Sequence, residues 1–217
     1  MLKRFAAYLQ TQNIQANIQN NQYNSRNRLY LNNSNIRNTI IQSRDILYNN
    51  LNNNNLKFAE KISFRQGGNY VVAIGYNPAL NLANKIDKTN NLLAEYFNSL
   101  KYDGYYLFNM LPDVSGTKVP KKNSSYPDYI ENVLDFLIQD SSTCNCDIFI
   151  FWGSSVYLNN DVICKLNKIK TNCSRGINTI GTKNICHRHP GRVVGANQIW
   201  SFAVNLNQLM KGVHYLK

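Results

Sequence analysis

The sequence contains no hydrophobic run long enough to cross a membrane. Spanning a bilayer takes roughly 18 consecutive apolar residues, and no apolar run in this 217-residue chain approaches that length. The opening segment, MLKRFAAYLQ, carries two charges and then turns polar, without the apolar stretch and small-residue cleavage site of a signal peptide. We therefore expect a cytoplasmic protein with no membrane partner.

Acidic residues are scarce, because 12 Asp and Glu stand against 24 Lys and Arg, for a formal net charge of +12. A strongly basic chain attracts polyanions, chiefly nucleic acid or acidic membrane surfaces. The alternative is codon bias in an AT-rich genome, which would raise Asn, Ile, Lys and Tyr at the expense of acidic residues. We expect a nucleic-acid partner, with DNA favoured over RNA.

Cysteines are few and odd in number, at 5, which argues against a disulfide framework. Cys144 and Cys146, together with Cys173, Cys186 and the nearby histidines, raise the alternative of a zinc site. Their spacing matches no common zinc finger, in which paired ligands stand about two to four residues apart. We expect no metal and no cofactor.

Three short apolar segments carry most of the information about the fold: 71–78, 105–112 and 147–153. Continuous apolar runs of about four to eight residues are typical of strands buried on both faces. Helical patterns lie between them, which favours parallel pairing, and a fourth strand is expected at 176–182. With 43% hydrophobic residues, we predict a globular α/β fold, with a mostly parallel central sheet between layers of helices.

Helices are expected where apolar residues recur at helical spacing. They are predicted at 1–10, 36–50, a stretch after Asp87, 127–139, 156–170 and 196–211. The stretch after Asp87 has an apolar stripe made of Leu92, Leu93, Tyr96, Phe97 and Leu100. Asp87 and Thr89 are both residue types that favour a helix cap.

The first 55 residues differ in composition from the rest of the chain. Residues 11–35 are rich in Asn and Gln, so we expect a loop there. Arginines and tyrosines in and near this segment could contact a nucleic acid or could belong to a solvated arm. They are Arg26, Arg28, Arg37, Tyr23 and Tyr30. We divide the chain into an N-terminal segment with helices, 1–55, and an α/β domain, 56–217.

Residues 56–64 place apolar side chains on even positions, which is the period of a half-buried strand. Gly67-Gly68 then predicts a hairpin with 69–76, so this strand should be antiparallel and at or near an edge. A long basic loop at 112–127 carries three lysines that we expect at a nucleic-acid backbone. They are Lys118, Lys121 and Lys122.

Five motifs follow one another in an informative order: Asn77-Pro78, Asp87-x-Thr89, Asn109, Trp152-Gly153 and His189-Pro190. In this order and spacing they resemble the bacterial and phage family called domain of unknown function 1643. The resemblance covers residues 56–205 and leaves out the N-terminal 55. Because that family has no settled activity, the resemblance implies little about chemistry.

A second, more distant resemblance carries more information about fold and function. Gly75-Tyr76-Asn77-Pro78 is similar to the first motif of the uracil-DNA glycosylase superfamily, in which a Gly-x-Asn-Pro turn closes the first core strand. Asn109 is similar to the asparagine that recognises the pyrimidine edge. His189-Pro190 is similar to the start of the motif that closes the pocket. The resemblance implies a three-layer α/β/α sandwich with its site at the carboxyl ends of the strands, where α/β sheets bind ligands.

The resemblance also implies roles in cleaving an N-glycosidic bond, which requires a positioned water, an extruded base and stabilisation of the departing base. Asn77 would hold the water, Asn109 would recognise the base with its donor and acceptor, and His189 would stabilise the leaving base. The remaining pocket residues would be Gly75, Tyr76, Trp152 and Gly153.

Two departures from the superfamily pattern matter. Gly191-Arg192-Val193 replaces the expected Ser-Pro-Leu, so Arg192 would have to contact phosphate instead of the serine. Asn77 stands where the most active branch has Asp, which predicts weak water activation. Three functions stay open: a base glycosylase on nucleic acid, an inactive nucleic-acid-binding or interaction module of a phage or mobile element, and an enzyme acting on a free nucleotide.

Overall fold

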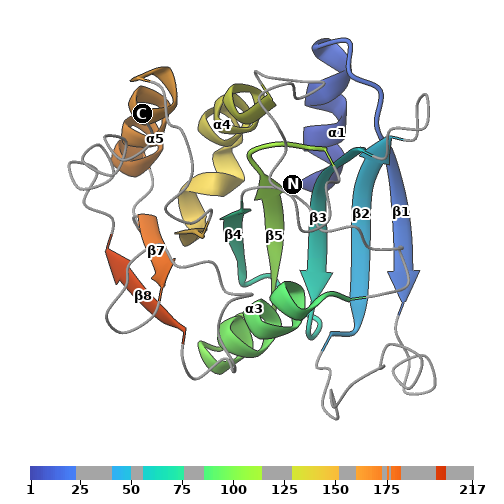
Figure 1. Cartoon of the computed structure of the whole chain (residues 1–217), viewed down its shortest axis with the longest axis vertical. Coiled ribbons are helices and arrows are strands. Elements are labelled where there is room, and N and C mark those ends of the chain that lie inside the picture. Colours follow the sequence, from blue (N-terminus) through green and yellow to red (C-terminus); the bar gives the residue numbers. More distant parts are fainter. Residues whose placement is uncertain are drawn as a thin grey trace.

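One sheet of eight strands runs through the part of the chain that the computed structural model describes (Figure 1). The described residues are 1–22, 41–49, 56–75, 86–113, 129–151, 160–172, 175, 177–181 and 199–203. The strands are β1 (Asn17–Gln22), β2 (Ser43–Asn49), β3 (Leu56–Ser63), β4 (Tyr70–Gly75), β5 (Gly104–Asn109), β6 (Ile148–Ile150), β7 (Ile177–Gly181) and β8 (Trp200–Ala203). Their order in the sheet is β1-β2-β3-β5-β4-β6-β7-β8.

The centre of the sheet is parallel and both of its sides are antiparallel. β5, β4, β6 and β7 pair in parallel, whereas β1, β2 and β3 on one side and β8 on the other pair antiparallel. The residues of β4 from Val71 to Gly75 are all buried, as expected for a strand with neighbours on both edges and helices on both faces. The α/β class and the four parallel strands are confirmed. The prediction of a mostly parallel sheet is wrong, because antiparallel pairings on both sides outnumber the parallel ones at the centre.

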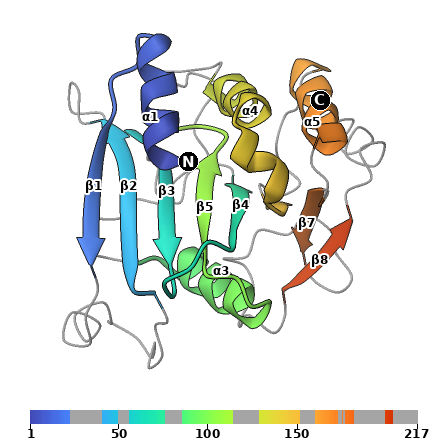
Figure 2. The same ribbon diagram turned by 180° about the vertical axis from the view of Figure 1, so that it is seen from behind.

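Helices cover both faces of the sheet, as Figures 1 and 2 show from opposite sides. They are α1 (Leu2–Thr11), α3 (Lys88–Ser99), α4 (Tyr129–Gln139) and α5 (Asn160–Asn172), with a short 3-10 helix, η2 (Ser141–Asn145). The helices α1, α4 and α5 share one apolar core with the sheet, and α3 shares the other. The predictions of helices at 1–10, after Asp87, at 127–139 and at 156–170 are confirmed.

Aromatic side chains dominate both cores. Phe5 of α1 is fully buried, and its ring centroid lies 4.9 Å from that of Phe136 and 5.1 Å from that of Phe108. On the opposite face, the rings of Phe97 and Phe149 lie 5.1 Å apart. These contacts fix α1 against α4 and the sheet, and α3 against β6.

Asp87 begins α3 as predicted. Its carboxylate Oδ1 accepts a hydrogen bond from the backbone N–H of Asn90 at 2.7 Å, which satisfies one of the free donors at the start of a helix. Thr89 is the second helical residue and does not provide the cap. The predicted apolar stripe is buried except for Leu100, which lies just after the last helical turn and is 43% exposed.

The N-terminal segment is more extended than predicted. Residues 43–49, expected in a helix, form β2, and residues 17–22, expected in a loop, form β1. β1 is polar because an edge strand is held by backbone hydrogen bonds to one neighbour and needs little apolar burial. β2 is a strand because it pairs with β1 on one side and β3 on the other. The two strands thereby extend the sheet of the α/β domain.

The predicted hairpin between residues 56–64 and 69–76 is wrong, because β5 lies between β3 and β4. Gly104, the first residue of β5, fits between them: an added Cβ would lie 2.2 Å from the Ile62 carbonyl oxygen and 2.4 Å from the Tyr70 ring. Asp103 holds the connection from β3 to β4 by accepting from the Asn69 N–H at 2.9 Å and pairing with Arg65 at 3.0 Å. β3 is therefore an interior strand and lies away from the edge.

The prediction of a helix near the C-terminus is also wrong where the structure describes it. Within 196–211, expected to be helical, residues 200–203 form β8 and pair antiparallel with β7. This four-residue strand at the end of the strand order is stabilised by its backbone hydrogen bonds to β7, which a side-chain pattern does not reveal. Residues 204–211 lie outside the described part of the chain.

Candidate functional site

Two of the predicted site residues meet at the carboxyl end of the parallel strands. Gly75 and Asn109 are the last residues of β4 and β5, and they are direct neighbours in the register of the two strands. Asn109 is only 2% exposed. The structure thus brings together the glycine and the asparagine that the sequence assigned to one pocket.

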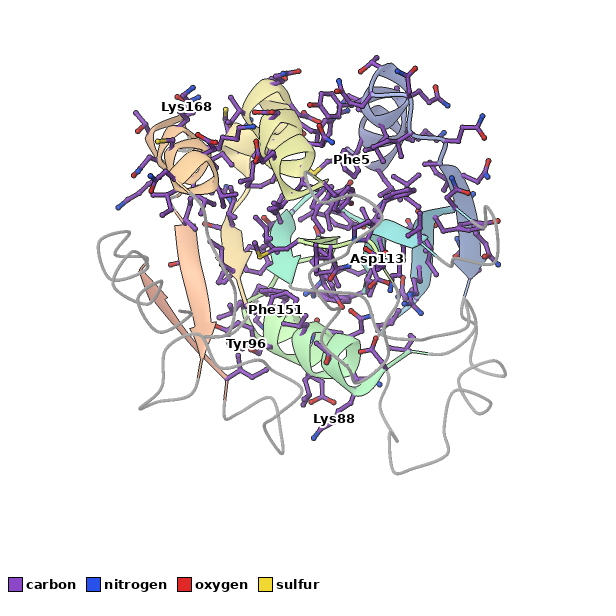
Figure 3. The ribbon with its side chains drawn as sticks, turned by 45° about the horizontal axis from the view of Figure 1, so that its top comes forward. Phe5, Lys88, Tyr96, Asp113, Phe151 and Lys168 are labelled. Carbon is purple, nitrogen blue, oxygen red and sulfur yellow. The ribbon has the colours of Figure 1, made fainter. Side chains whose placement is uncertain are left out.

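The missing side chain at Gly75 leaves room for two neighbours. A Cβ built on Gly75 would lie 3.0 Å from Asn109 Oδ1 and 2.9 Å from the ring of Phe151. Phe151, directly after β6, lies on the side of the sheet that α3 covers, as does Tyr96 (Figure 3). Glycine at position 75 therefore allows an amide and an aromatic ring to approach each other over the end of β4.

The Asn109 amide has unused hydrogen-bonding capacity. Its Nδ2 is buried and has no hydrogen-bond partner among the residues that the structure describes. Leaving a buried donor unsatisfied costs about 1–3 kcal/mol, so such groups in folded proteins call for an explanation. A ligand that offers an acceptor to Nδ2 would recover this free energy.

The other predicted site residues fall outside the described part of the chain. They are Tyr76, Asn77, Lys118, Lys121, Lys122, Trp152, Gly153, His189 and Arg192. Their roles remain predictions, as do those of Arg26, Arg28, Arg37, Tyr23 and Tyr30 in the N-terminal segment.

A buried ion network, which the sequence did not predict, lies on the α3 side of the sheet. Glu60 of β3 accepts from Arg44 Nε at 2.6 Å and from Lys57 Nζ at 2.7 Å. Arg44 and Glu60 are fully buried, and Lys57 is 6% exposed. Buried charges are tolerated when they are paired in this way.

A β-bulge brings Lys57 and Glu60 to the same face of the sheet. Leu47 pairs with Ala59 and Tyr48 with Lys57, so β3 carries one extra residue between these pairs. In a regular strand, residues three apart point to opposite faces, and the bulge removes that alternation. The only signal in the sequence is that Glu60 occupies an even position in a series that is otherwise apolar.

The network continues into α3 and β5. Asn90 Nδ2 donates to Glu60 Oε1 at 3.1 Å and to Asp87 Oδ2 at 3.2 Å. The Tyr105 hydroxyl donates to Asn90 Oδ1 at 2.8 Å. Hydrogen bonds and ion pairs thus join β2, β3, β5 and the first turn of α3 into one rigid polar cluster.

The charges in this cluster set its protonation. Burial by itself raises the pKa of Glu60, but the positive charges of Arg44 and Lys57 outweigh burial and bring it from 4.5 to about 2. Burial lowers the pKa of Lys57, and the Glu60 carboxylate opposes that shift. Burial and the Glu60 charge raise the pKa of Tyr105 well above its usual value, so its hydroxyl remains a donor.

The ion network supports the strand end that carries Asn109. Glu60 pairs in register with Leu107, and Asn109 lies two residues further along β5 on the same face. The cluster therefore holds β5, the strand that carries Asn109, against β3 and the first turn of α3. A rigid support of this kind lets a single polar group select a ligand by its hydrogen-bonding pattern.

Comparisons with protein-family models, curated proteins and solved structures found no match for this chain. Among the described residues, no helix has the length and apolar character needed to cross a membrane. No group of three His, Cys, Asp or Glu side chains that could bind a metal occurs in that part of the chain. Among the described residues, Cys144, Cys146 and Cys164 form no disulfide bond.

Proposed function

We propose that the protein binds nucleic acid and holds one base at the carboxyl ends of β4 and β5, where Asn109 recognises its edge. The observation that carries this proposal is the buried Asn109 Nδ2, which lacks a partner among the described residues. The net charge of +12 supports a polyanionic partner. The position at the end of parallel strands is where α/β sheets bind ligands.

A nucleobase suits the neighbourhood of this amide. An Asn side chain offers a donor and an acceptor side by side, which matches the hydrogen-bonding edge of a base. Phe151 supplies an apolar contact, and Gly75 presents backbone without a side chain. Burial of the Asn109 amide strengthens the discrimination between bases. A base with the wrong pattern of donors and acceptors would leave the amide unsatisfied in a medium of low polarity.

We further propose that the protein hydrolyses the N-glycosidic bond of a damaged or modified base, with a fold like that of the uracil-DNA glycosylases. This step rests on the sequence resemblance. Water held by Asn77 would add to the sugar carbon and release one proton to solvent, and the base would leave with the bonding electrons. His189 would stabilise the departing base by donating a hydrogen bond, and the base would then take up a proton.

A glycosylase assay tests the proposal directly. The protein is incubated with oligonucleotides that carry uracil, other deaminated bases or phage-type modified bases, and abasic sites are detected by alkaline cleavage. We expect cleavage by the unchanged protein and its loss in Asn109→Leu, Asn77→Ala and His189→Ala. Leucine has the same number and branching of side-chain heavy atoms as asparagine, so Asn109→Leu removes the hydrogen bonds and keeps the shape.

The matched control is Asn167→Leu, the same substitution at an exposed position of α5. Full activity in all three site variants would overturn the assigned roles. Binding measured in parallel separates recognition from catalysis, because Asn109→Leu should abolish preference for a base over an abasic position. Base-independent binding by the unchanged protein, without cleavage, would support an inactive binding module instead.

A further inference from the structure

A cleft lies at the amino end of the parallel strands, opposite the end that carries Asn109. It encloses about 760 Å³, which is within the range of about 300–1,000 Å³ typical of ligand sites. Its lining includes Arg4 of α1, Lys61 of β3, Tyr70 of β4, Tyr106 of β5, Asn145 of η2 and Arg175, shortly before β7. Among the described residues that line this amino-end cleft, none is acidic.

Two arginines of the amino-end cleft are held with their charge facing solvent. Arg4 is 58% exposed, whereas its partner Asp140, at 2.9 Å, is 4% exposed. Arg175 is 49% exposed, whereas its partner Asp147, at 3.4 Å, is 18% exposed. Asp147 is itself fixed by the Tyr102 hydroxyl, which donates to it at 2.7 Å. Each carboxylate therefore lies beneath its arginine and orients the guanidinium. Arg4 Nη2 also donates to Ser142 Oγ at 2.8 Å, so among the described residues Arg4 Nη1 and the Nε and Nη2 of Arg175 are the donors left for a ligand.

Aromatic side chains adjoin these cations. Lys61 Nζ lies 4.8 Å from the centroid of the Tyr70 ring, and the Tyr70 and Tyr106 rings lie 5.4 Å apart. The Tyr70 hydroxyl donates to Ser63 Oγ at 2.8 Å, which keeps the ring in place. Asp45 stands opposite Lys61 on the neighbouring strand. The combination of arginines, a lysine and tyrosine rings is the one that proteins use for phosphates and bases together.

We infer that the amino-end cleft binds a phosphate-bearing nucleotide, either free or as part of a nucleic-acid strand. The cations Arg4, Lys61 and Arg175 hold the phosphate, and the tyrosines contact the base or sugar. Planar guanidinium groups suit phosphate because two N–H donors match two phosphate oxygens.

This site is separate from the one at Asn109. Tyr70 and Gly75 are the first and last residues of β4, and five residues of strand span roughly 16 Å. Tyr106 packs with the core of α1 and α4, whereas Asn109 and Phe151 lie on the α3 side. The inference therefore does not depend on the proposed base site.

Titration calorimetry on the full chain tests the inference with four probes: inorganic phosphate, thymidine, thymidine monophosphate and a short oligothymidylate. We expect the monophosphate, the oligonucleotide or both to bind, and thymidine to bind at least tenfold more weakly. Binding of the oligonucleotide alone would assign the site to a strand, and binding of the monophosphate assigns it to a free nucleotide as well. Lys61→Gln and Arg175→Gln should each weaken binding about tenfold, the effect of one lost charged hydrogen bond.

A matched control variant makes the result decisive. Lys168→Gln makes the same charge change on exposed α5 (Figure 3), and it should leave binding unchanged. Equal weakening in Lys61→Gln, Arg175→Gln and Lys168→Gln would indicate diffuse attraction and overturn the inference. Failure of every phosphate-bearing probe to bind the unchanged protein would also overturn it.

Discussion

At the scale of single residues, this protein is distinguished by polar side chains that are buried in its interior. Asn109 is nearly inaccessible, and its Nδ2 lacks a partner among the described residues. Glu60, in contrast, is fully buried and satisfied by Arg44, Lys57 and Asn90. An unsatisfied amide near a carboxylate that has three donors suggests that stability was given up at one position for recognition.

Substituting Asn109 by Leu should raise the free energy of unfolding by about 1 kcal/mol, because it removes a buried donor without a partner. The same change should abolish base recognition. Urea denaturation monitored by circular dichroism measures the first effect. A fall in the free energy of unfolding in Asn109→Leu would show that the amide has a structural role and would contradict our proposal.

Glu60 makes stability depend on pH. Its pKa in the folded protein, about 2, lies below its usual 4.5, so the contribution of the carboxylate is complete above about pH 4.5. As the pH falls toward 2 this contribution is lost, because the unfolded chain binds the proton more tightly. The shift corresponds to a loss on the order of 3 kcal/mol.

Urea denaturation between pH 2 and pH 7 checks this dependence. In Glu60→Gln the free energy of unfolding at pH 7 should be about 3–5 kcal/mol lower, because two buried cations lose their counter-ion. The decrease in the free energy of unfolding between pH 7 and pH 2 should also be smaller in this variant than in the unchanged protein. The control is Glu95→Gln at an exposed position of α3, and it should behave like the unchanged protein.

At the scale of the elements, the insertion of β5 between β3 and β4 decides the topology. Gly104 permits the close approach of the three strands, and Asp103 fastens the connection between β3 and β4 to the start of β5. A crossover through a helix, here α3, is the usual way for parallel strands to become neighbours. A short Gly-rich connection does not by itself predict a hairpin.

Gly104→Ala should lower the free energy of unfolding by about 3 kcal/mol, because the methyl group would collide with the backbone of β3. Gly68→Ala is the matched control, since a Cβ there has no neighbour within 4 Å. The free energies of unfolding of the two variants are compared by thermal and urea denaturation. Equal stability of the two variants would mean that β3 and β5 do not approach each other as described.

At the scale of the whole molecule, the sheet separates two polar regions. The buried Asn109 lies at the carboxyl end on the α3 side, and the amino-end cleft lies at the other end between α1 and η2. The chain also carries a net charge of +12. The net charge and these two regions are the features on which our proposal of a polyanionic partner rests.

The affinity for a duplex or single-stranded oligonucleotide should fall at least roughly tenfold between about 50 and 200 mM salt, because bound phosphates release counter-ions. Fluorescence anisotropy over this salt series provides the measurement. Lys61→Gln and Arg175→Gln should each reduce the slope of log affinity against log salt by about one if that strand occupies the amino-end cleft. An affinity that does not change with salt would rule out a phosphate-tracking surface.

The sequence by itself determined the parallel centre of the sheet, the helices α1, α3, α4 and α5, and the Asp87 cap. A continuous apolar run such as Val71–Ile74 indicates burial on both faces, and a stripe such as Leu93 to Phe97 indicates one buried helical face. It also placed Gly75 and Asn109 at one strand end. These features follow from local periodicity and from the direction of the strands.

Only the tertiary structure decided which segments pair. β1 and β8 are strands because a neighbouring backbone completes their hydrogen bonds, and β5 separates β3 from β4 although the chain between those two is short. The bulge in β3 then gathers Lys57 and Glu60 on one face. Local patterns report the burial of each side chain, but pairing depends on contacts between residues distant in sequence, which a one-dimensional pattern does not contain.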